Sequence, residues 1–206
     1  TGHEGYNPSI GLANYSFKNI AVAVYTSGTQ DTVIYVMIGE INSAGKTVTK
    51  WTKLTHAFHG RNPKIAVNNL GKVVITFNDD YGGIFSVVGT INSACTDITW
   101  YGETPVVSGT KDHASVGLAN DGSVVLVYQG QAIKDDIASI QYEYDFPIKC
   151  KFGTLDSNDL LTWESDELHG FWMGKKPDIA TNGTCVVSVQ ETPDFIEGGV
   201  QMNNSN

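Results

Sequence analysis

The sequence predicts an all-β protein, and three of its features carry that prediction. Valine, isoleucine, threonine and aromatic residues dominate every apolar run, which is the composition of strands rather than of helices. Glycine, asparagine and aspartate dominate the gaps between the runs, where turns require them. One opening pattern and one closing pattern recur along the chain, so we expect a single four-stranded unit to be repeated.

Residues 60–109 present this unit in its clearest form. An alternating run over residues 64–68 leads through Asn68-Asn69-Leu70-Gly71 into a second run at 72–77, which is a hairpin signal. A third run follows at 84–88 and a fourth at 97–101. The first two runs are mostly apolar and suit buried inner strands, whereas the more polar fourth run suits an outer edge.

The two recurring patterns divide the rest of the chain. The opening pattern is Gly60-Arg61-Asn62-Pro63, and its other versions are Gly5-Tyr6-Asn7-Pro8, Lys111-Asp112-His113-Ala114 and Gly174-Lys175-Lys176-Pro177. The closing pattern is a glycine followed, after an Asn-Ser or Asp-Ser pair, by a tryptophan: Gly39 with Trp51, Gly89 with Trp100, and Gly153 with Trp163. We therefore expect one domain over residues 1–206, with units at about 3–59, 60–109 and 110–173 and an incomplete unit at 174–206.

The other units follow the same plan. Further strands are expected near residues 9–13, 20–25, 33–38, 48–54, 123–128, 137–152 and 185–189. Pro147 is expected to break or bulge the long run at 137–152, because proline cannot donate to a sheet ladder. Four antiparallel strands in each unit of about 50 residues predict a β-propeller built from four-stranded antiparallel blades. A two-layer sandwich is the alternative, but it does not require the same patterns in every unit.

Composition restricts the partners. The chain carries 22 acidic and 13 basic residues, a formal charge of -9, and Arg61 is its one arginine. Such a surface argues against nucleic acid and against anionic membranes, and no apolar run approaches the roughly 20 residues of a membrane span. Three dispersed cysteines form neither a disulfide framework nor a zinc motif, so no metal or cofactor is expected. Asn-x-Ser/Thr triplets at Asn14, Asn182 and Asn203 favour an extracellular location.

The blade patterns resemble a known group of proteins. The Gly-x-Asn-Pro opening, the Asn/Asp-Gly turn, the valine-rich second strand and the closing Ile-Thr-Trp resemble the blades of bacterial and fungal propeller lectins. Residues 157–163 also resemble the Asp-box of sialidase-like propellers, although they lack its glycine and one residue of its spacing. Sialidases hold their substrate with a cluster of three arginines, so this single-arginine chain is not expected to be one.

Strand parity predicts where a ligand would bind. The connectors from the second to the third strand and those between units emerge on the same face, because each strand reverses direction. They carry carboxylates, imidazoles and aromatic rings, which together bind sugar hydroxyls and stack on sugar rings. The candidate ligand-binding residues are His59, Asp79, Asp80, Tyr81, His113, Asp135, Asp136, Phe171 and Trp172. These residues predict non-catalytic binding of glycans.

Two other functions are also compatible with the sequence. A glycoside hydrolase could use paired loop carboxylates, Asp79-Asp80 with Asp135-Asp136, although only one of the matching inner-strand positions Ser9, Lys64, Ser115 and Asp178 is acidic. A protein-interaction scaffold could use Phe171-Trp172-Met173 in an exposed connector. The repeated tryptophans are expected to pack between blades rather than to bind ligand.

Three and a half blades leave a propeller unclosed. We expect either a homo-oligomer that completes the ring or a chain that is part of a larger propeller, with a compact four-bladed ring as the third solution.

Overall fold

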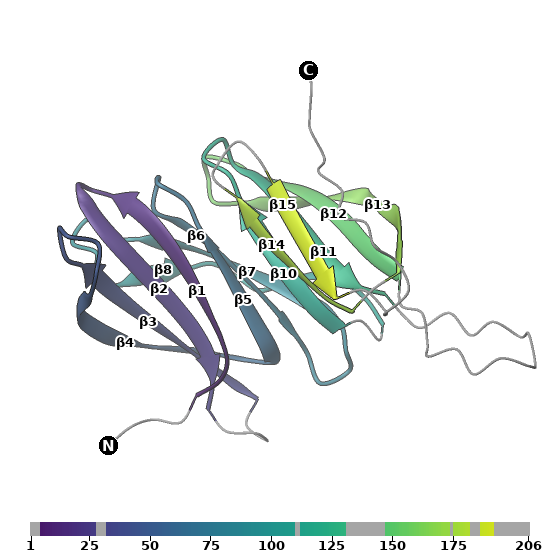
Figure 1. Cartoon of the computed structure of the whole chain (residues 1–206), viewed down its shortest axis with the longest axis horizontal. Coiled ribbons are helices and arrows are strands. Elements are labelled where there is room, and N and C mark those ends of the chain that lie inside the picture. The colour runs from purple at the N-terminus through teal and green to yellow at the C-terminus, as the bar shows by residue number, and fades with distance from the viewer. Residues whose placement is uncertain are drawn as a thin grey trace, which may run out of the picture.

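The structure is a computed structural model that describes residues 5–27, 32–109, 112–130, 147–173, 175–181 and 186–191 (Figure 1). These residues form antiparallel strands and turns, so the fold is all-β, as the sequence predicts. In the same residues there is no helix long and apolar enough to cross a membrane.

The strands form sheets in chain order. Sheet A contains β1 (Tyr6–Tyr15), β2 (Lys18–Thr26), β3 (Val33–Ile41) and β4 (Val48–His59). Sheet B contains β5 (Arg61–Val67), β6 (Lys72–Asn78), β7 (Ile84–Ile91) and β8 (Ile98–Trp100), with β9 (Thr104–Val107) also paired to β7. Sheet C contains β10 (Asp112–Leu118), β11 (Ser123–Gln129), β12 (Pro147–Leu155) and β13 (Leu161–Met173). β14 (Lys175–Thr181) and β15 (Val186–Glu191) form a two-stranded sheet.

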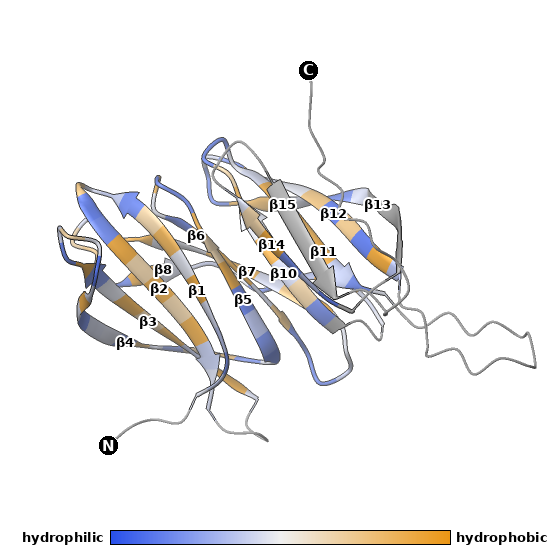
Figure 2. Ribbon diagram, viewed as in Figure 1, coloured by the Kyte–Doolittle hydropathy of each residue, from blue (hydrophilic) through white to orange (hydrophobic). Residues whose placement is uncertain are grey.

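The sheets lie face against face in a row. The first strand of each sheet packs beside the first strand of the next, so β1, β5, β10 and β14 lie in sequence (Figure 1). Sheet B is covered on both faces: Val73 and Ile75 of β6 belong to the core shared with sheet A, and Val74 belongs to the core shared with sheet C. This is why β6 is buried continuously from Val73 to Asn78, and Figure 2 shows hydrophobic residues along β6 and the strands around it.

The closing pattern is a cross-strand pair of glycine and tryptophan. Gly39 lies opposite Trp51, Gly89 opposite Trp100 and Gly153 opposite Trp163. A Cβ atom added at each glycine would meet the facing indole ring at 3.0 Å or less. Each glycine therefore makes room for a tryptophan ring to lie flat across its strand, which explains why the two residues recur together.

The tryptophan ring then reaches the preceding sheet. Trp100 packs edge-on against Phe58 of β4, with ring centroids 5.0 Å apart. The indole N–H of Trp163 donates to the hydroxyl of Ser86 in β7 at 3.2 Å. Trp100 and Trp163 thus pack between sheets, as expected from the sequence.

Two expected connectors are strands. His56 and His59 belong to β4, because its pairing with β3 resumes after a bulge and continues to Val33 opposite His59. Phe171 and Trp172 belong to β13, which bulges in the same way and continues to Met173 opposite Pro147. The expectation that these residues lie in loops is therefore wrong. Pro147 stands at the first position of β12, where its missing N–H interrupts nothing.

Candidate functional site

The opening pattern folds into a bulge near the start of each first strand. In β1, β5, β10 and β14 the antiparallel register gains one extra residue soon after the strand begins. A residue in each bulge has a left-handed backbone, with φ of 49° at Asn7, 50° at Asn62, 46° at His113 and 49° at Lys176. Asparagine and histidine tolerate this region better than most residues. The opening pattern of the sequence thus corresponds to a bulge within the first strand.

Buried polar side chains lie beside these bulges at the ends of the second strands β2, β6 and β11. The hydroxyl of Thr26, at the end of β2, donates to the carbonyl of Tyr6 at 3.1 Å. The side-chain oxygen of Gln129, at the end of β11, accepts from the backbone N–H of Lys176 in the next sheet at 3.3 Å. Asn78 occupies the same position in β6 and is also buried. Buried polar groups need partners, and Thr26 and Gln129 find theirs in the bulged backbone of β1 and β14. The sequence signal for them is a polar residue that ends an apolar strand.

The bulged ends of neighbouring strands contact each other through polar groups. Nδ2 of Asn7 in β1 donates to Oδ1 of Asn62 in β5 at 3.1 Å, and this pair is exposed. Two residues farther along, the Ser9 hydroxyl accepts from the backbone N–H of Ile65 at 3.3 Å. The same end of the row of strands is therefore polar from sheet A to sheet B.

Lys64 of β5, Ser115 of β10 and Asp178 of β14 form a cluster that links these three first strands. We call it the inner-strand cluster. The Ser115 hydroxyl donates to Oδ1 of Asp178 at 2.6 Å, and Nζ of Lys64 lies 3.8 Å from the same oxygen. The backbone N–H of Ile179 also donates to that oxygen, at 3.0 Å. Ser115 is buried, whereas the side chains of Lys64 and Asp178 are 33% and 58% exposed. A cation and a carboxylate are thus held by neighbouring strands and remain open to solvent.

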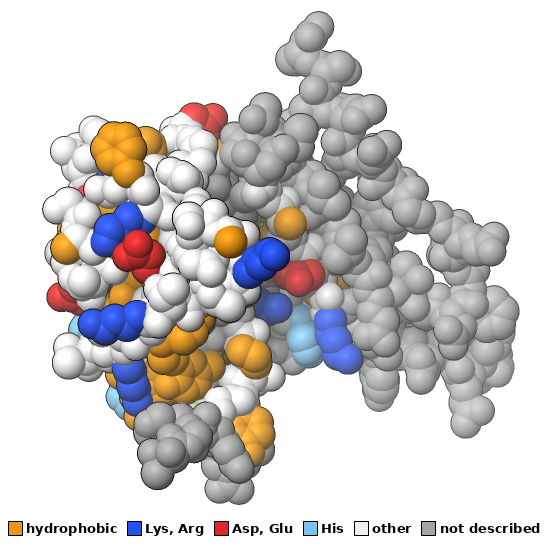
Figure 3. Space-filling model, turned by 60° about the vertical axis from the view of Figure 1, so that its left-hand side comes forward, with side chains coloured by type: hydrophobic (Ala, Val, Ile, Leu, Met, Phe, Trp, Pro, Cys, Tyr) orange, Lys and Arg blue, Asp and Glu red, His pale blue; other side chains and the backbone are white. Residues whose placement is uncertain are grey.

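The cluster and the neighbouring asparagines offer both hydrogen-bond donors and hydrogen-bond acceptors. The ammonium of Lys64 only donates and the carboxylate of Asp178 only accepts, while the amides of Asn7 and Asn62 do both. A ligand with many hydroxyl groups would find partners of each kind here. Figure 3 shows basic, acidic and histidine side chains close together beside the region of uncertain placement.

The loop between β6 and β7 carries three of the predicted ligand-binding residues. The carboxylate of Asp79 accepts from the backbone N–H groups of Tyr81 at 2.9 Å and Gly83 at 2.6 Å, so it shapes the turn. Asp80 forms an exposed ion pair with Arg61 at 3.2 Å. Because Arg61 directly precedes Asn62, this ion pair ties the loop to the bulged end of β5. Tyr81 is exposed beside them.

The other predicted residues fall in different places. His113 is the bulge residue of β10, and His59 ends β4, one residue before Gly60. Phe171 and Trp172 are strand residues of β13, and their side chains lie outside the described part of the structure. Asp135 and Asp136 lie outside the described residues altogether. The structure thus brings Asp79, Asp80 and Tyr81 to the bulged end of β5, and it adds the inner-strand cluster to the candidate site.

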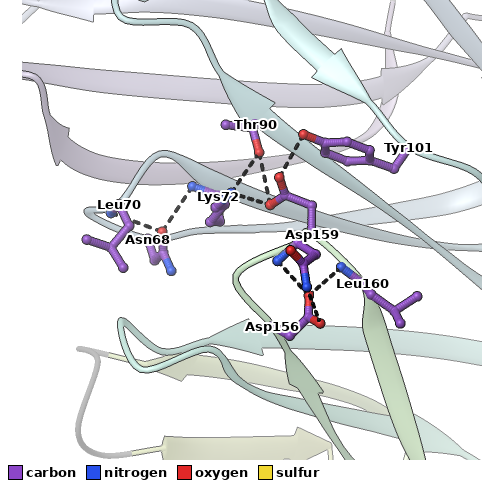
Figure 4. Close-up of polar contacts among 9 residues, drawn as sticks. Asn68, Leu70, Lys72, Thr90, Tyr101, Asp156, Asp159 and Leu160 are labelled. Atoms are coloured by element: carbon purple, nitrogen blue, oxygen red, sulfur yellow. Dashed lines mark hydrogen bonds and ion pairs between the residues drawn. The ribbon is translucent and has the colours of Figure 1, made fainter.

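The Asp-box-like segment forms a contact between sheets. Asp159 lies in the turn between β12 and β13, with a left-handed φ of 64°. Its carboxylate accepts hydrogen bonds from Nζ of Lys72, from the Thr90 hydroxyl at 3.2 Å and from the Tyr101 hydroxyl at 2.7 Å (Figure 4). These three partners belong to sheet B and the segment that follows it. We call this group the Asp159 latch, because it fastens the turn of sheet C to sheet B.

Burial and the charge of Lys72 shift the pKa of Asp159 in opposite directions. Burial raises the pKa of Asp159, but hydrogen bonds from Lys72 and Tyr101 and the Lys72 charge outweigh it, so the pKa lies below its ordinary value. The side chains of Lys72 and Asp159 are only 22% and 12% exposed. The latch is therefore a half-buried ion pair whose carboxylate already has three hydrogen-bond partners within the protein.

Comparison with known proteins identifies no family. No family model matches the sequence, and no curated protein is significantly similar to it. One similar solved structure is that of MPT-4, a mannose phosphorylase from Leishmania mexicana, in complex with phosphate ion. It has a TM-score of 0.38 and 10% sequence identity, over 82% of this chain and 63% of that chain. This chain thus spans less than two thirds of the other's length, and a likeness of this degree carries no argument about function.

Proposed function

We propose that this protein binds carbohydrate without catalysis, as a lectin, and that its sheets are blades of a β-propeller. The observation that carries the proposal is the inner-strand cluster, in which Lys64 and Asp178 stand 3.8 Å apart at the polar end of the row of first strands and remain solvent-exposed. The left-handed residues near the start of all four first strands support it, since non-glycine residues with this backbone cluster at functional sites.

The ligand chemistry follows from the groups present. A sugar offers adjacent hydroxyls that both donate and accept, so one hydroxyl donates to Asp178 while its neighbour accepts from Lys64. Tyr81 offers an exposed aromatic face on which the apolar side of a sugar ring can stack. We still predict, from the sequence alone, that Phe171 and Trp172 stack on a sugar ring and that Asp135 and Asp136 accept hydrogen bonds from its hydroxyls.

The arrangement favours binding over hydrolysis. Hydrolysis requires two carboxyl groups roughly 5 to 10 Å apart on either side of the scissile bond. The four matching first-strand positions are Ser9, Lys64, Ser115 and Asp178, with one carboxylate among them. Asp79 caps its own turn and Asp80 pairs with Arg61, so this pair is engaged structurally.

The test compares two variants in the cluster with a matched control. Asp178→Asn removes the charge of the acceptor, and Lys64→Met removes the cation while keeping most of the side-chain length. Asp121→Asn makes the same chemical change in the β10–β11 hairpin, at the opposite end of the first strands. Glycan-array screening identifies a bound sugar, and titration calorimetry with that sugar measures affinity.

We expect Asp178→Asn and Lys64→Met each to weaken binding at least about tenfold, as loss of a hydrogen bond to a charged group does, and Asp121→Asn to leave it unchanged. Equal affinity in the cluster variants and the wild type would refute the site, and an array with no bound glycan would refute the lectin. Release of reducing sugar by the wild type, lost in Asp178→Asn, would establish the hydrolase instead.

A further inference from the structure

The outer face of sheet A carries apolar side chains that the other sheets bury. We call it the leading face and define it by Ile10, Leu12, Tyr35, Met37 and Trp51. Ile10 is 55% exposed, Leu12 61% and Trp51 38%, although all three are large and apolar. Figure 3, in which this side of the molecule is turned forward, shows hydrophobic side chains grouped on it. A patch of this kind on a soluble protein marks an interaction surface.

The first strands of the other sheets show what covers such a face. In β5, Val67 packs on Gly11 of β1, so closely that a Cβ atom on Gly11 would lie 2.6 Å from the valine Cγ2. In β14, Ile179 and Thr181 lie over Gly117 of β10 in the same way, at 3.6 and 3.4 Å from the position of its Cβ. β5 thus places Val67, and β14 places Ile179 and Thr181, on a small residue of the sheet before it.

Ile10 and Leu12 are the corresponding side chains of β1. They follow the bulge residue Asn7 by three and five residues, as Ile179 and Thr181 follow Lys176. They face away from sheet B, because the alternation of the strand turns Gly11 toward β5. Ile10 and Leu12 therefore occupy the positions that pack on the preceding sheet in β5 and β14, and among the described residues no other sheet lies against them.

β14 carries a small, exposed residue of the kind on which such side chains pack. Ala180 follows Lys176 by four residues, as Gly11 follows Asn7, so it is the small residue of this strand. It points away from Ile179 and Thr181 and is exposed. Figure 1 shows β1 and β14 on opposite sides of β5 and β10, so these two surfaces do not meet within one chain.

We propose that the leading face binds the β14 face of a second copy of this chain. Ile10 and Leu12 of one copy pack on Ala180 of the other, as Ile179 and Thr181 pack on Gly117. Such a contact is head-to-tail, and a two-fold axis repeats it so that two chains close into one ring. A second copy is the partner we choose because one chain carries both matching surfaces, Ile10 and Leu12 on β1 and Ala180 on β14, at opposite ends of its row of sheets. The contact does not depend on carbohydrate binding.

The experiment measures mass in solution by light scattering during gel filtration. The wild type is expected at twice the 22.3 kDa of one chain. Leu12→Glu and Ala180→Glu each place a charge in the contact, and each is expected to give a monomer. Leu70→Glu is the matched control, because Leu70 is an equally exposed leucine in the β5–β6 turn, away from both faces. It is expected to remain dimeric.

Mixing the two variants separates this contact from other modes of pairing. Equal amounts of Leu12→Glu and Ala180→Glu retain one intact contact, so the mixture is expected to form a dimer that neither variant forms alone. A face-to-face dimer would instead lose its pairing in Leu12→Glu and keep it in Ala180→Glu, which would overturn the proposal. So would a monomeric wild type or a dimeric Leu12→Glu. Circular dichroism spectra matching the wild type establish that each variant is folded, and Ile10→Glu replaces Leu12→Glu if the latter is not.

Discussion

The Asp159 latch offers the sharpest test of how the sheets are held together. Asp159→Asn keeps the shape of the side chain and the tolerance of asparagine for the left-handed backbone at φ 64°, but it removes the charge that Lys72 faces. Hydrogen bonds to charged groups contribute about 1.5–3 kcal/mol, and leaving a mostly buried cation without its counter-ion adds to the loss. We expect the free energy of unfolding at pH 7 to fall by about 2 kcal/mol, a drop of about 4–8 °C in Tm for a chain of this size.

Urea unfolding followed by tryptophan fluorescence measures this difference, and a neighbouring aspartate supplies the control. The Asp156 carboxylate accepts from the backbone N–H groups of Asn158 and Leu160, and Asn42 and Asn92 make the corresponding bonds with amide oxygens. Asp156→Asn should therefore change stability by less than about 0.5 kcal/mol, as surface substitutions do. The double variant with Lys72→Met and Asp159→Asn should lose less free energy of unfolding than the sum of the losses in the two single variants, because neither charge is then left without its partner.

The pH dependence of the latch has a definite sign. Because the pKa of Asp159 is lowered in the folded state, its contribution is complete above the unfolded pKa of about 3.9 and is lost as the pH falls through the folded value. The gap between wild type and Asp159→Asn should thus close in acid. A variant as stable as the wild type at pH 7, or a gap that persists at low pH, would refute the ion-pair account.

Three further predictions concern glycine, the bulges and a thiol. Gly89→Ala should destabilise by about 1–3 kcal/mol in thermal melts, because its Cβ would lie 2.6 Å from the Trp100 ring, whereas Gly102→Ala has nothing within 4 Å and should be neutral within about 0.5 kcal/mol. Asn62→Gly should have the same urea midpoint as the wild type, but Asn62→Val should lose about 1–2 kcal/mol because a β-branched residue resists φ of 50°. An Asn62→Val variant with the wild-type midpoint would contradict this account. Burial raises the pKa of the Cys95 thiol, so a thiol reagent at pH 8 should label it much more slowly in the native protein than in urea, as mass spectrometry of its peptide would show.

Local patterns in the sequence predict the strands and tight turns well, because a hairpin depends on neighbouring residues. The turn at Asn68-Asn69-Leu70-Gly71 is one example, since the Asn68 side chain bonds the backbone of Leu70 and Lys72 within the same loop. The pairing of Gly89 with Trp100 is visible as a repeated spacing, although its cause appears only when the two residues face each other. Where strands end is less predictable, because the bulge in β13 lets pairing continue to Met173 through residues that the sequence assigns to a connector.

The candidate site depends on contacts between distant residues. The sequence identifies equivalent positions at Lys64, Ser115 and Asp178. Their side chains come into contact only because three first strands pack side by side. The loop aspartates Asp79 and Asp80 attract attention in the sequence, yet the structure engages one in its own turn and the other with Arg61.

The sequence by itself determined that this protein is all-β, because strand composition and turn residues are local. Only the tertiary structure decided that Asp159 is a half-buried latch between sheets, that the opening patterns are bulges, and that the faces bearing Leu12 and Ala180 remain exposed. Those outcomes depend on which sheet packs on which, and packing joins residues that no local pattern relates.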